Sequence, residues 1–152
     1  ANTTEELSVV RVTPNATSTN SAVSRTEILF EGSAIYFSGG RFGHTTVPEG
    51  RPAVSLVHSS HTCGFSNEQC SIVLRGGDVD LRDMREQADV IAVSVVGDPN
   101  VNVSWTGTSA ILRSGESSDV AIVFVDGPPT TLFSPHVTVE NASLTLDGAR
   151  TF

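Results

Sequence analysis

Alternation of apolar and polar residues over short stretches is the main pattern in this chain. Residues 101–105 show it most clearly, because Val101, Val103 and Trp105 fall on one side of an extended segment and Asn102 on the other. Turn-forming residues separate each such stretch from the next. We therefore expect an all-β domain of about ten short strands. The expected strands cover residues 7–12, 26–30, 34–37, 53–57, 71–74, 89–96, 101–105, 110–112, 119–125, 137–139 and 144–146.

Two pairs of successive strands are separated by segments that look like hairpin loops, which favours antiparallel pairing. Residues 53–57 and 71–74 flank a loop with two cysteines, and residues 110–112 and 119–125 flank the turn Ser114-Gly115-Glu116. Many short antiparallel strands with turns between them are typical of a β-sandwich or jelly roll. We predict that architecture, and we find no internal repeat in the sequence.

One segment, residues 80–88, has the residue spacing of a helix. Asp80 can cap the first turn, and Leu81, Met84 and Ala88 share a face at positions i, i+3 and i+7. A helix this short forms only when it packs on other elements. We therefore predict one short helix that lies on the sheets near residues 80–88.

The first strand is set apart from the rest of the chain. Pro14 ends it, and residues 15–24 form a Ser-, Thr- and Asn-rich tract without periodicity. We divide the chain into residues 1–24, a strand with a flexible linker, and residues 25–152, a single β-sandwich domain. A detached apolar strand can complete the sheet of a neighbouring subunit, or it can fold back on its own domain. The side chains that would form such a subunit interface are Leu7, Val9, Val10 and Val12.

Charge excludes several classes of partner. The formal net charge is -8, and all nine basic residues are arginines. Nucleic acids and anionic membranes attract clustered basic residues, which this chain lacks. No apolar stretch is long enough to cross a bilayer, and we expect any signal peptide to have been removed. We predict neither nucleic-acid binding nor membrane insertion.

Two cysteines, Cys63 and Cys70, lie close together in the sequence. Their even number and the Gly and Asn between them favour a disulfide that closes a loop. The alternatives are free thiols or a metal site with His58 and His61, but the spacing differs from that of structural zinc sites. We predict a disulfide between Cys63 and Cys70 and no bound metal.

Four Asn-x-Ser/Thr sequons are present, at Asn2, Asn15, Asn102 and Asn141. Glycosylation at such sites requires the secretory route and an exposed position. Disulfides also form mainly outside the cytosol. Both features predict an extracellular or cell-surface glycoprotein.

Motifs of catalysis are absent from the sequence. There is no Gly-x-Ser-x-Gly elbow, phosphate-binding loop or dinucleotide fingerprint. Asp78, Asp80 and Asp83 form a loose acidic segment that resembles a calcium-binding loop, but the spacing of an EF-hand is missing. A turn followed by a helix N-terminus is the favoured interpretation of these residues. We predict that the protein is not an enzyme and needs no cofactor.

Function is therefore expected on the surface of the domain. The leading hypothesis is a structural subunit of a pilus, fibre or coat that self-associates into a homopolymer by donating its N-terminal strand. The alternative is an adhesion or receptor-binding ectodomain of a cell-surface or viral glycoprotein with a cell-surface or glycan ligand.

Overall fold

Short parallel strands make up the whole described structure. The computed structural model describes residues 2–3, 6–12, 27–39, 44–45, 52–59, 70–96, 101–126 and 135–152. No helix occurs among these residues, and every strand pair is parallel. The strands are β1 (Asn2–Thr3), β2 (Leu7–Val12), β3 (Glu27–Glu31), β4 (Ala34–Gly39), β5 (His44–Thr45), β6 (Val54–Ser59), β7 (Cys70–Arg75), β8 (Asp78–Asp83), β9 (Val90–Val96), β10 (Val101–Thr106), β11 (Ser109–Ser114), β12 (Asp119–Asp126), β13 (His136–Glu140), β14 (Ser143–Asp147) and β15 (Arg150–Thr151).

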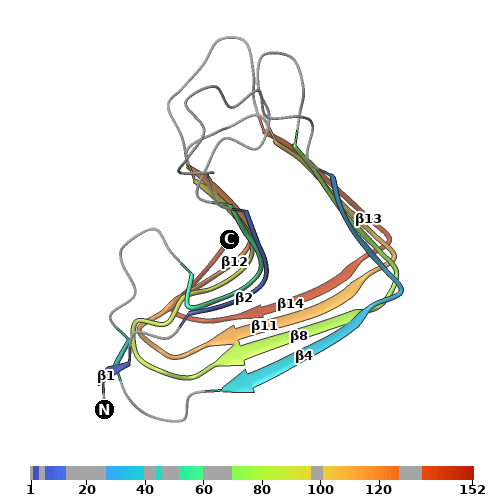
Figure 1. The fold of residues 1–152 in the computed structure, drawn as a ribbon. Coiled ribbons are helices and arrows are strands. Elements are labelled where there is room, and N and C mark those ends of the chain that lie inside the picture. Colours follow the sequence, from blue (N-terminus) through green and yellow to red (C-terminus); the bar gives the residue numbers. More distant parts are fainter. Residues whose placement is uncertain are drawn as a thin grey trace, which may run out of the picture.

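The strands form three sheets around one interior (Figure 1). Sheet 1 has the order β13-β10-β7-β3, sheet 2 the order β14-β11-β8-β4, and sheet 3 the order β15-β12-β9-β6-β2, while β1 and β5 form a separate pair. The chain passes from sheet 1 to sheet 2 to sheet 3 and then begins the next coil. Four coils result, β3-β4-β6, β7-β8-β9, β10-β11-β12 and β13-β14-β15, with β2 one coil earlier in sheet 3. The fold is a parallel β-helix, in which each coil stacks on the one before it.

Sheet 3 is strongly bent, and its strands arch toward the interior of the helix (Figure 1). The ladder skips one position at the bend, because β12 pairs with β9 at Ala121 and again at Val123. β2 and β6 show the same interruption between Ser8 and Val10. The bend makes the outer face of sheet 3 concave, and this concave face carries the candidate site.

The all-strand content agrees with the sequence reading, but the predicted antiparallel sandwich is wrong. β6 and β7 belong to different sheets, and so do β11 and β12, although we expected each of these pairs to form a hairpin. The physical reason is that alternation reports only that a segment is extended with two different faces. Glycine turns serve both a hairpin and a corner between two sheets, so the local pattern does not show which strand is the partner.

The predicted helix near residues 80–88 is also wrong. β8 extends to Asp83, and its alternation places Val79, Leu81 and Asp83 inside. The chain then turns, and the Arg85 guanidinium donates hydrogen bonds to both oxygens of the buried Asp83 carboxylate, to Oδ1 at 3.0 Å and to Oδ2 at 2.6 Å. Strand pairing on both sides of β8 outweighs the weak tendency of so short a segment to form a helix.

Columns of apolar side chains fill the interior of the helix. The register places equivalent residues of successive coils side by side, so each inward position becomes a column. Trp105 is the largest fully buried side chain. Coil by coil, the inward positions of sheets 1 and 2 hold Ile28, Phe30, Ile35 and Phe37; Ile72, Leu74, Val79 and Leu81; Val103, Trp105, Ala110 and Leu112; and Val137, Val139, Leu144 and Leu146.

These columns follow a repeat that we did not find in the sequence. The repeat is apolar-x-apolar-x-Gly/Asn-x-x-apolar-x-apolar. At its centre lies the corner between sheets 1 and 2, with positive φ angles of 58° at Gly32, 66° at Gly76, 63° at Gly107 and 50° at Asn141. Only glycine, and less readily asparagine, adopts this left-handed backbone at low cost. The expectation of no internal repeat is thus wrong. The repeat is hard to recognise in the sequence because segments of unequal length separate its four copies.

Candidate functional site

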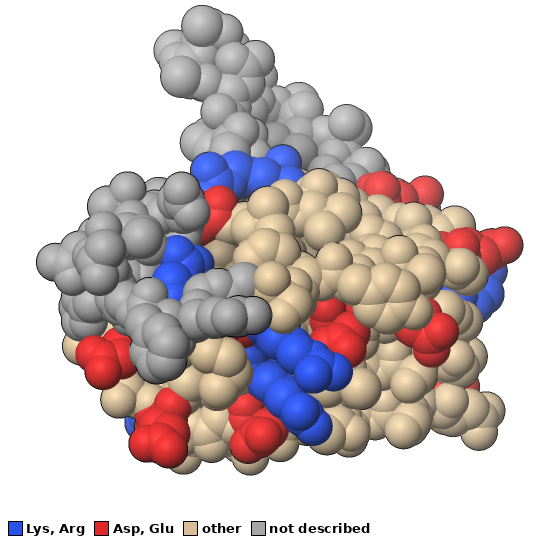
Figure 2. Space-filling view, turned by 90° about the horizontal axis from the view of Figure 1, so that it is seen from below, with Lys and Arg blue, Asp and Glu red and all other residues tan. Residues whose placement is uncertain are grey.

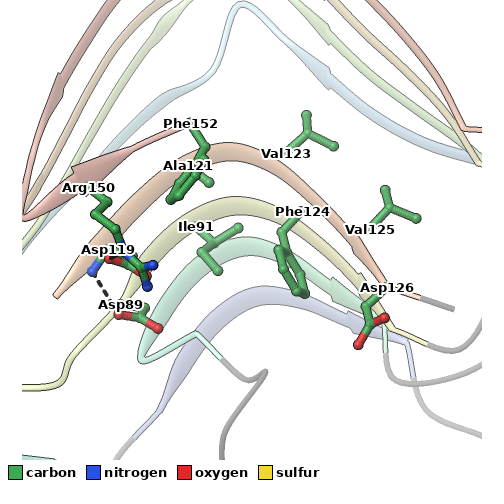
Figure 3. Close-up of a pocket in the computed structure, with 10 residues that line it drawn as sticks. All are labelled: Asp89, Ile91, Asp119, Ala121, Val123, Phe124, Val125, Asp126, Arg150 and Phe152. Carbon is green, nitrogen blue, oxygen red and sulfur yellow. Dashed lines mark hydrogen bonds and ion pairs between the residues drawn. The ribbon is translucent and has the colours of Figure 1, made fainter.

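The concave face of sheet 3 carries a cavity of about 850 Å³ near the last coil (Figure 3). Strands β9, β12 and β15 build it. Ten residues line it: Asp89, Ile91, Asp119, Ala121, Val123, Phe124, Val125, Asp126, Arg150 and Phe152. Apart from Val123 and Val125, whose side chains point toward the interior of the helix, the lining comes from outward-facing positions and from the edge of β12.

Three charged residues form a column at one end of this cavity. The Arg150 guanidinium donates to both carboxylate oxygens of Asp119, at 3.0 and 2.6 Å. The Asp89 carboxylate accepts a hydrogen bond from the backbone N–H of Asp119 at 2.8 Å. Partial burial raises the pKa of Asp89, and the charge of Asp119 raises it further, although the hydrogen bond and Arg150 oppose this. The column therefore keeps two carboxylates close together beside one cation.

The remainder of the cavity is largely apolar. Phe124 and Ile91 lie on the concave side, as Figure 3 shows, with Asp126 at the far end of the same strand as Phe124. The Arg150 guanidinium lies 5.8 Å from the centre of the Phe152 ring, within the range of a cation–π contact. The cavity thus combines an apolar floor with the Asp119–Arg150 ion pair at one end and Asp126 at the other.

β12 pairs with β15 at the charged end of this cavity. β15 pairs with β12 at Asp119 and Val120, and Phe152 adds two backbone hydrogen bonds, to Val120 and from Ile122. Beyond this point, residues 123–126 have no strand beside them on the side away from β9, as far as the described residues go.

The strand at the opposite edge of sheet 3 is β2, for which the sequence left open donation to a neighbouring subunit or pairing within its own domain. It pairs in parallel with β6 of its own chain, from Leu7 beside Val54 to Val12 beside Ser59. Leu7 and Val9 are about half exposed, whereas Val10 packs on the core. The other edge of β2 pairs with no strand in the described part of the chain.

None of the predicted glycosylation and disulfide sites that the structure describes lines this cavity. Asn102 is partly exposed in the middle of sheet 1, and Asn141 is exposed at a corner of the last coil. Asn2 lies in β1, and Cys70 begins β7. Asn15 and Cys63 lie outside the described residues. Glycan attachment and the disulfide stay predictions.

The histidine and acidic candidates do not converge on a site. His58 is buried in β6, where its Nδ1 lies 3.2 Å from the Ser94 hydroxyl, and His61 lies outside the described residues. Asp80 accepts two hydrogen bonds from Arg82 on the outer face of sheet 2, while Asp83 points inside. The described part of the chain contains no group of His, Cys, Asp and Glu residues suited to a metal ion.

Acidic and basic side chains mix on the lower surface. Figure 2 shows arginines between carboxylates on that face. Ion pairs across sheet 2 contribute to this mixture, since Arg113 lies 3.9 Å from Asp147 of the next coil. Within the ranges that the structure describes, no helix is long and apolar enough to span a membrane.

No family model, no curated protein and no solved structure matches this chain. The fold and the site are therefore interpreted from their own geometry.

The sequence reading did not identify the residues of the cavity. Asp89 lies directly before β9, while Asp119 and Arg150 start β12 and β15 of the next two coils. Phe124 lies in an apolar run. Alignment of the Gly/Asn corner residues would have placed them in adjacent coils. The repeat is thus the signal in the sequence that leads to this site.

Proposed function

We propose that this protein is a structural subunit of an extracellular fibre or coat and that its copies associate end to end through the edges of the β-helix. Each new copy continues the three sheets of the copy before it. Main-chain hydrogen bonds then supply much of the affinity, as in other cases of strand addition. The sequons and the predicted disulfide support the extracellular location.

The observation that carries the proposal is the match between the two outer edges of sheets 1 and 2 in the part of the chain that the structure describes. Among the described residues, no strand pairs with the outer edges of β3 and β4 on one side of sheets 1 and 2, or with those of β13 and β14 on the other. On β13, Val137 is 44% and Val139 42% exposed, whereas the equivalent residues of β7 and β10 are buried. Stacking β3 of a second copy on β13 in the register of the existing coils places Ile28 on Val137 and Phe30 on Val139. The joint thus continues the apolar columns of each copy.

Charged residues at the joint between β13 of one copy and β3 of the next affect how tightly the two copies associate. In this register Glu27 of the second copy faces His136, and Glu31 faces Glu140. Within one chain Glu31 instead lies beside Arg75, at 3.6 Å. Like charges directly opposite each other weaken strand pairing. The proposed fibre therefore forms more readily at high salt, where this repulsion is screened.

Light scattering coupled to size-exclusion chromatography tests the proposal, with electron microscopy of concentrated samples. The full chain is expected to form a concentration-dependent series of oligomers that become longer as salt increases. A Val139→Glu variant should remain monomeric, because it places a carboxylate in the apolar joint. Met84→Glu is the matched control, since Met84 is also a half-exposed apolar side chain but lies after β8, in a middle coil.

A full chain that stays monomeric at high concentration and high salt would refute the proposal. Equal loss of association in the Val139→Glu and Met84→Glu variants would also count against it. Circular dichroism of both variants confirms that the β-helix is intact before the comparison is made.

A further inference from the structure

We propose that the outer face of sheet 2 binds an acidic polysaccharide, whose uronic-acid carboxylates pair with Arg82 and Arg113. This inference goes beyond the proposed fibre, because it names a ligand for the side of the helix and not for its ends. Both arginines belong to middle coils, in β8 and β11, so each lies on a strand with a neighbour on either side. Three features support the site: the spacing of the two arginines, their incomplete pairing with carboxylates, and the side chains around them.

The ladder between β8 and β11 places Arg82 and Arg113 directly side by side on the outer face. Paired strands lie about 4.8 Å apart, so the two guanidinium groups can reach the same anion. Like charges in neighbouring positions of a sheet weaken strand pairing, and an anion bound between them removes this repulsion. Figure 2 shows the side on which sheet 2 lies in Figure 1, and arginines gather near the centre of that face.

The carboxylates of the chain neutralise the two arginines unequally. Arg82 donates from Nε and Nη2 to Asp80, at 2.6 and 2.7 Å, so its Nη1 is left for a ligand. Arg113 lies 3.9 Å from Asp147, which is beyond hydrogen-bond distance, and its buried Nε has no hydrogen-bond partner in the described part of the chain. A guanidinium donor without a partner gains most from a charged acceptor. Arg113 is therefore the primary contact for a carboxylate, and Arg82 supports it.

The side chains around the arginine pair suit sugar rings. Tyr36 is 68% exposed on β4, and Ile111 lies two residues before Arg113 on the same face of β11. An exposed aromatic ring and an aliphatic side chain offer an apolar surface on which the C–H face of a sugar packs. Hydroxyl groups, which both donate and accept hydrogen bonds as sugar hydroxyls do, also face outward from this sheet, at Ser38, Ser109, Ser143 and Thr145. This combination favours a polysaccharide over an acidic peptide.

The predicted glycans and the proposed association both leave this face free. Of the sequon asparagines that the structure describes, Asn2, Asn102 and Asn141, none lies in a strand of sheet 2. The proposed end-to-end association uses strand edges and not the outer faces. A fibre thus presents one arginine pair per copy, and a polysaccharide that spans several copies gains affinity through multivalency.

Fluorescence anisotropy with labelled alginate, a polysaccharide of uronic acids, tests the site on the full chain. At about 0.1 M salt, charges more than about 10 Å away are largely screened, so the measurement reports local contacts. We expect saturable binding, and about tenfold weaker binding to an Arg113→Gln variant. Arg75→Gln is the matched control, because Arg75 is also an exposed arginine of a middle coil beside a carboxylate, 3.6 Å from Glu31, but it lies in sheet 1. The affinity of this control should equal that of the original chain.

A second variant tests the site in the opposite direction. Asp147→Asn removes the carboxylate that competes with the ligand for Arg113, so it should bind alginate about threefold more tightly. Arg113→Gln should not lower the stability in urea unfolding, because it removes a like charge beside Arg82. A weaker affinity of Arg113→Gln then reports the site and not a damaged fold.

Neutral dextran and polyglutamate separate the alternatives. A chain that does not bind alginate, or that binds dextran equally well, would refute the proposal. Equal loss of affinity in Arg113→Gln and Arg75→Gln would also refute it, because any positive charge would then serve. Tighter binding of polyglutamate than of alginate would overturn the polysaccharide and assign the face to an acidic protein.

Discussion

Two adjacent glycines at one corner of the helix offer a sharp test of the coil geometry. Gly76 has a φ of 66° and Gly77 a φ of 84°, so alanine at either position has a strained backbone. A Cβ on Gly76 meets no atom within 4 Å, whereas a Cβ on Gly77 would lie 2.7 Å from the backbone nitrogen of Ser33 in the preceding coil. The two substitutions therefore differ in packing and share the same conformational penalty.

The expected magnitudes follow from this difference. A left-handed conformation costs an L-residue about 1–2 kcal/mol, and the stiffer unfolded chain offsets about 0.4–1 kcal/mol of that. Gly76→Ala should thus destabilise the protein by about 1 kcal/mol. Gly77→Ala adds a clash between two backbones, which cannot be relieved by rotating a side chain, and should cost about 3 kcal/mol or more. Gly76→Asn should cost less than Gly76→Ala, because Asn141 already occupies the equivalent corner at a φ of 50°.

Urea unfolding measures all three variants. The single tryptophan, Trp105, is fully buried in the next coil, so its fluorescence reports the loss of the core. The reasoning fails if Gly76→Ala and Gly77→Ala destabilise the protein equally, because the corner would then not stack on the preceding coil as described.

Further predictions concern charges at the joint, at the cavity and in the core. Glu140→Arg should lower the concentration at which oligomers form by about fivefold, because it places a cation opposite Glu31 of the next copy. If light scattering shows the same midpoint concentration for oligomer formation in this variant and in the original chain, β3 does not stack on β13 as proposed. Burial raises the pKa of Asp89 in the folded protein above its usual value of 3.8. The folded protein is therefore most favoured by this group below pH 3.8, where Asp89 is protonated. This contribution to stability is lost as the pH rises through the folded-state pKa. Asp89→Asn should therefore be more stable than the original chain at pH 7 and equally stable at pH 3, as judged by thermal melts, and a difference that is the same at both pH values would argue against it. Asp83→Ala should cost about 3–5 kcal/mol in urea unfolding because it leaves the guanidinium of Arg85 buried without its carboxylate, and a loss below about 1 kcal/mol would show that the pair is not structurally important.

Much of the strand content could be predicted from the sequence, and the site could not. Residues 101–105 alternate so regularly that β10 follows directly from the pattern. The segment after Asp78 shows the limit, since Leu81, Met84 and Ala88 fit a helix while Val79, Leu81 and Asp83 fit a strand. Pairing with β4 and β11 decides in favour of the strand, and those partners lie far away in the sequence.

The sequence by itself determined that this chain is made of short strands with one apolar face, because side-chain alternation and turn residues are local properties. Only the tertiary structure decided that the strands are parallel and coil into a helix, because pairing joins residues of different coils, such as Ile72 and Val103. The same holds for the cavity, where Asp89, Asp119 and Arg150 meet only after three coils have stacked. A local pattern fixes what a strand can bury, and the stacking of coils fixes its neighbours.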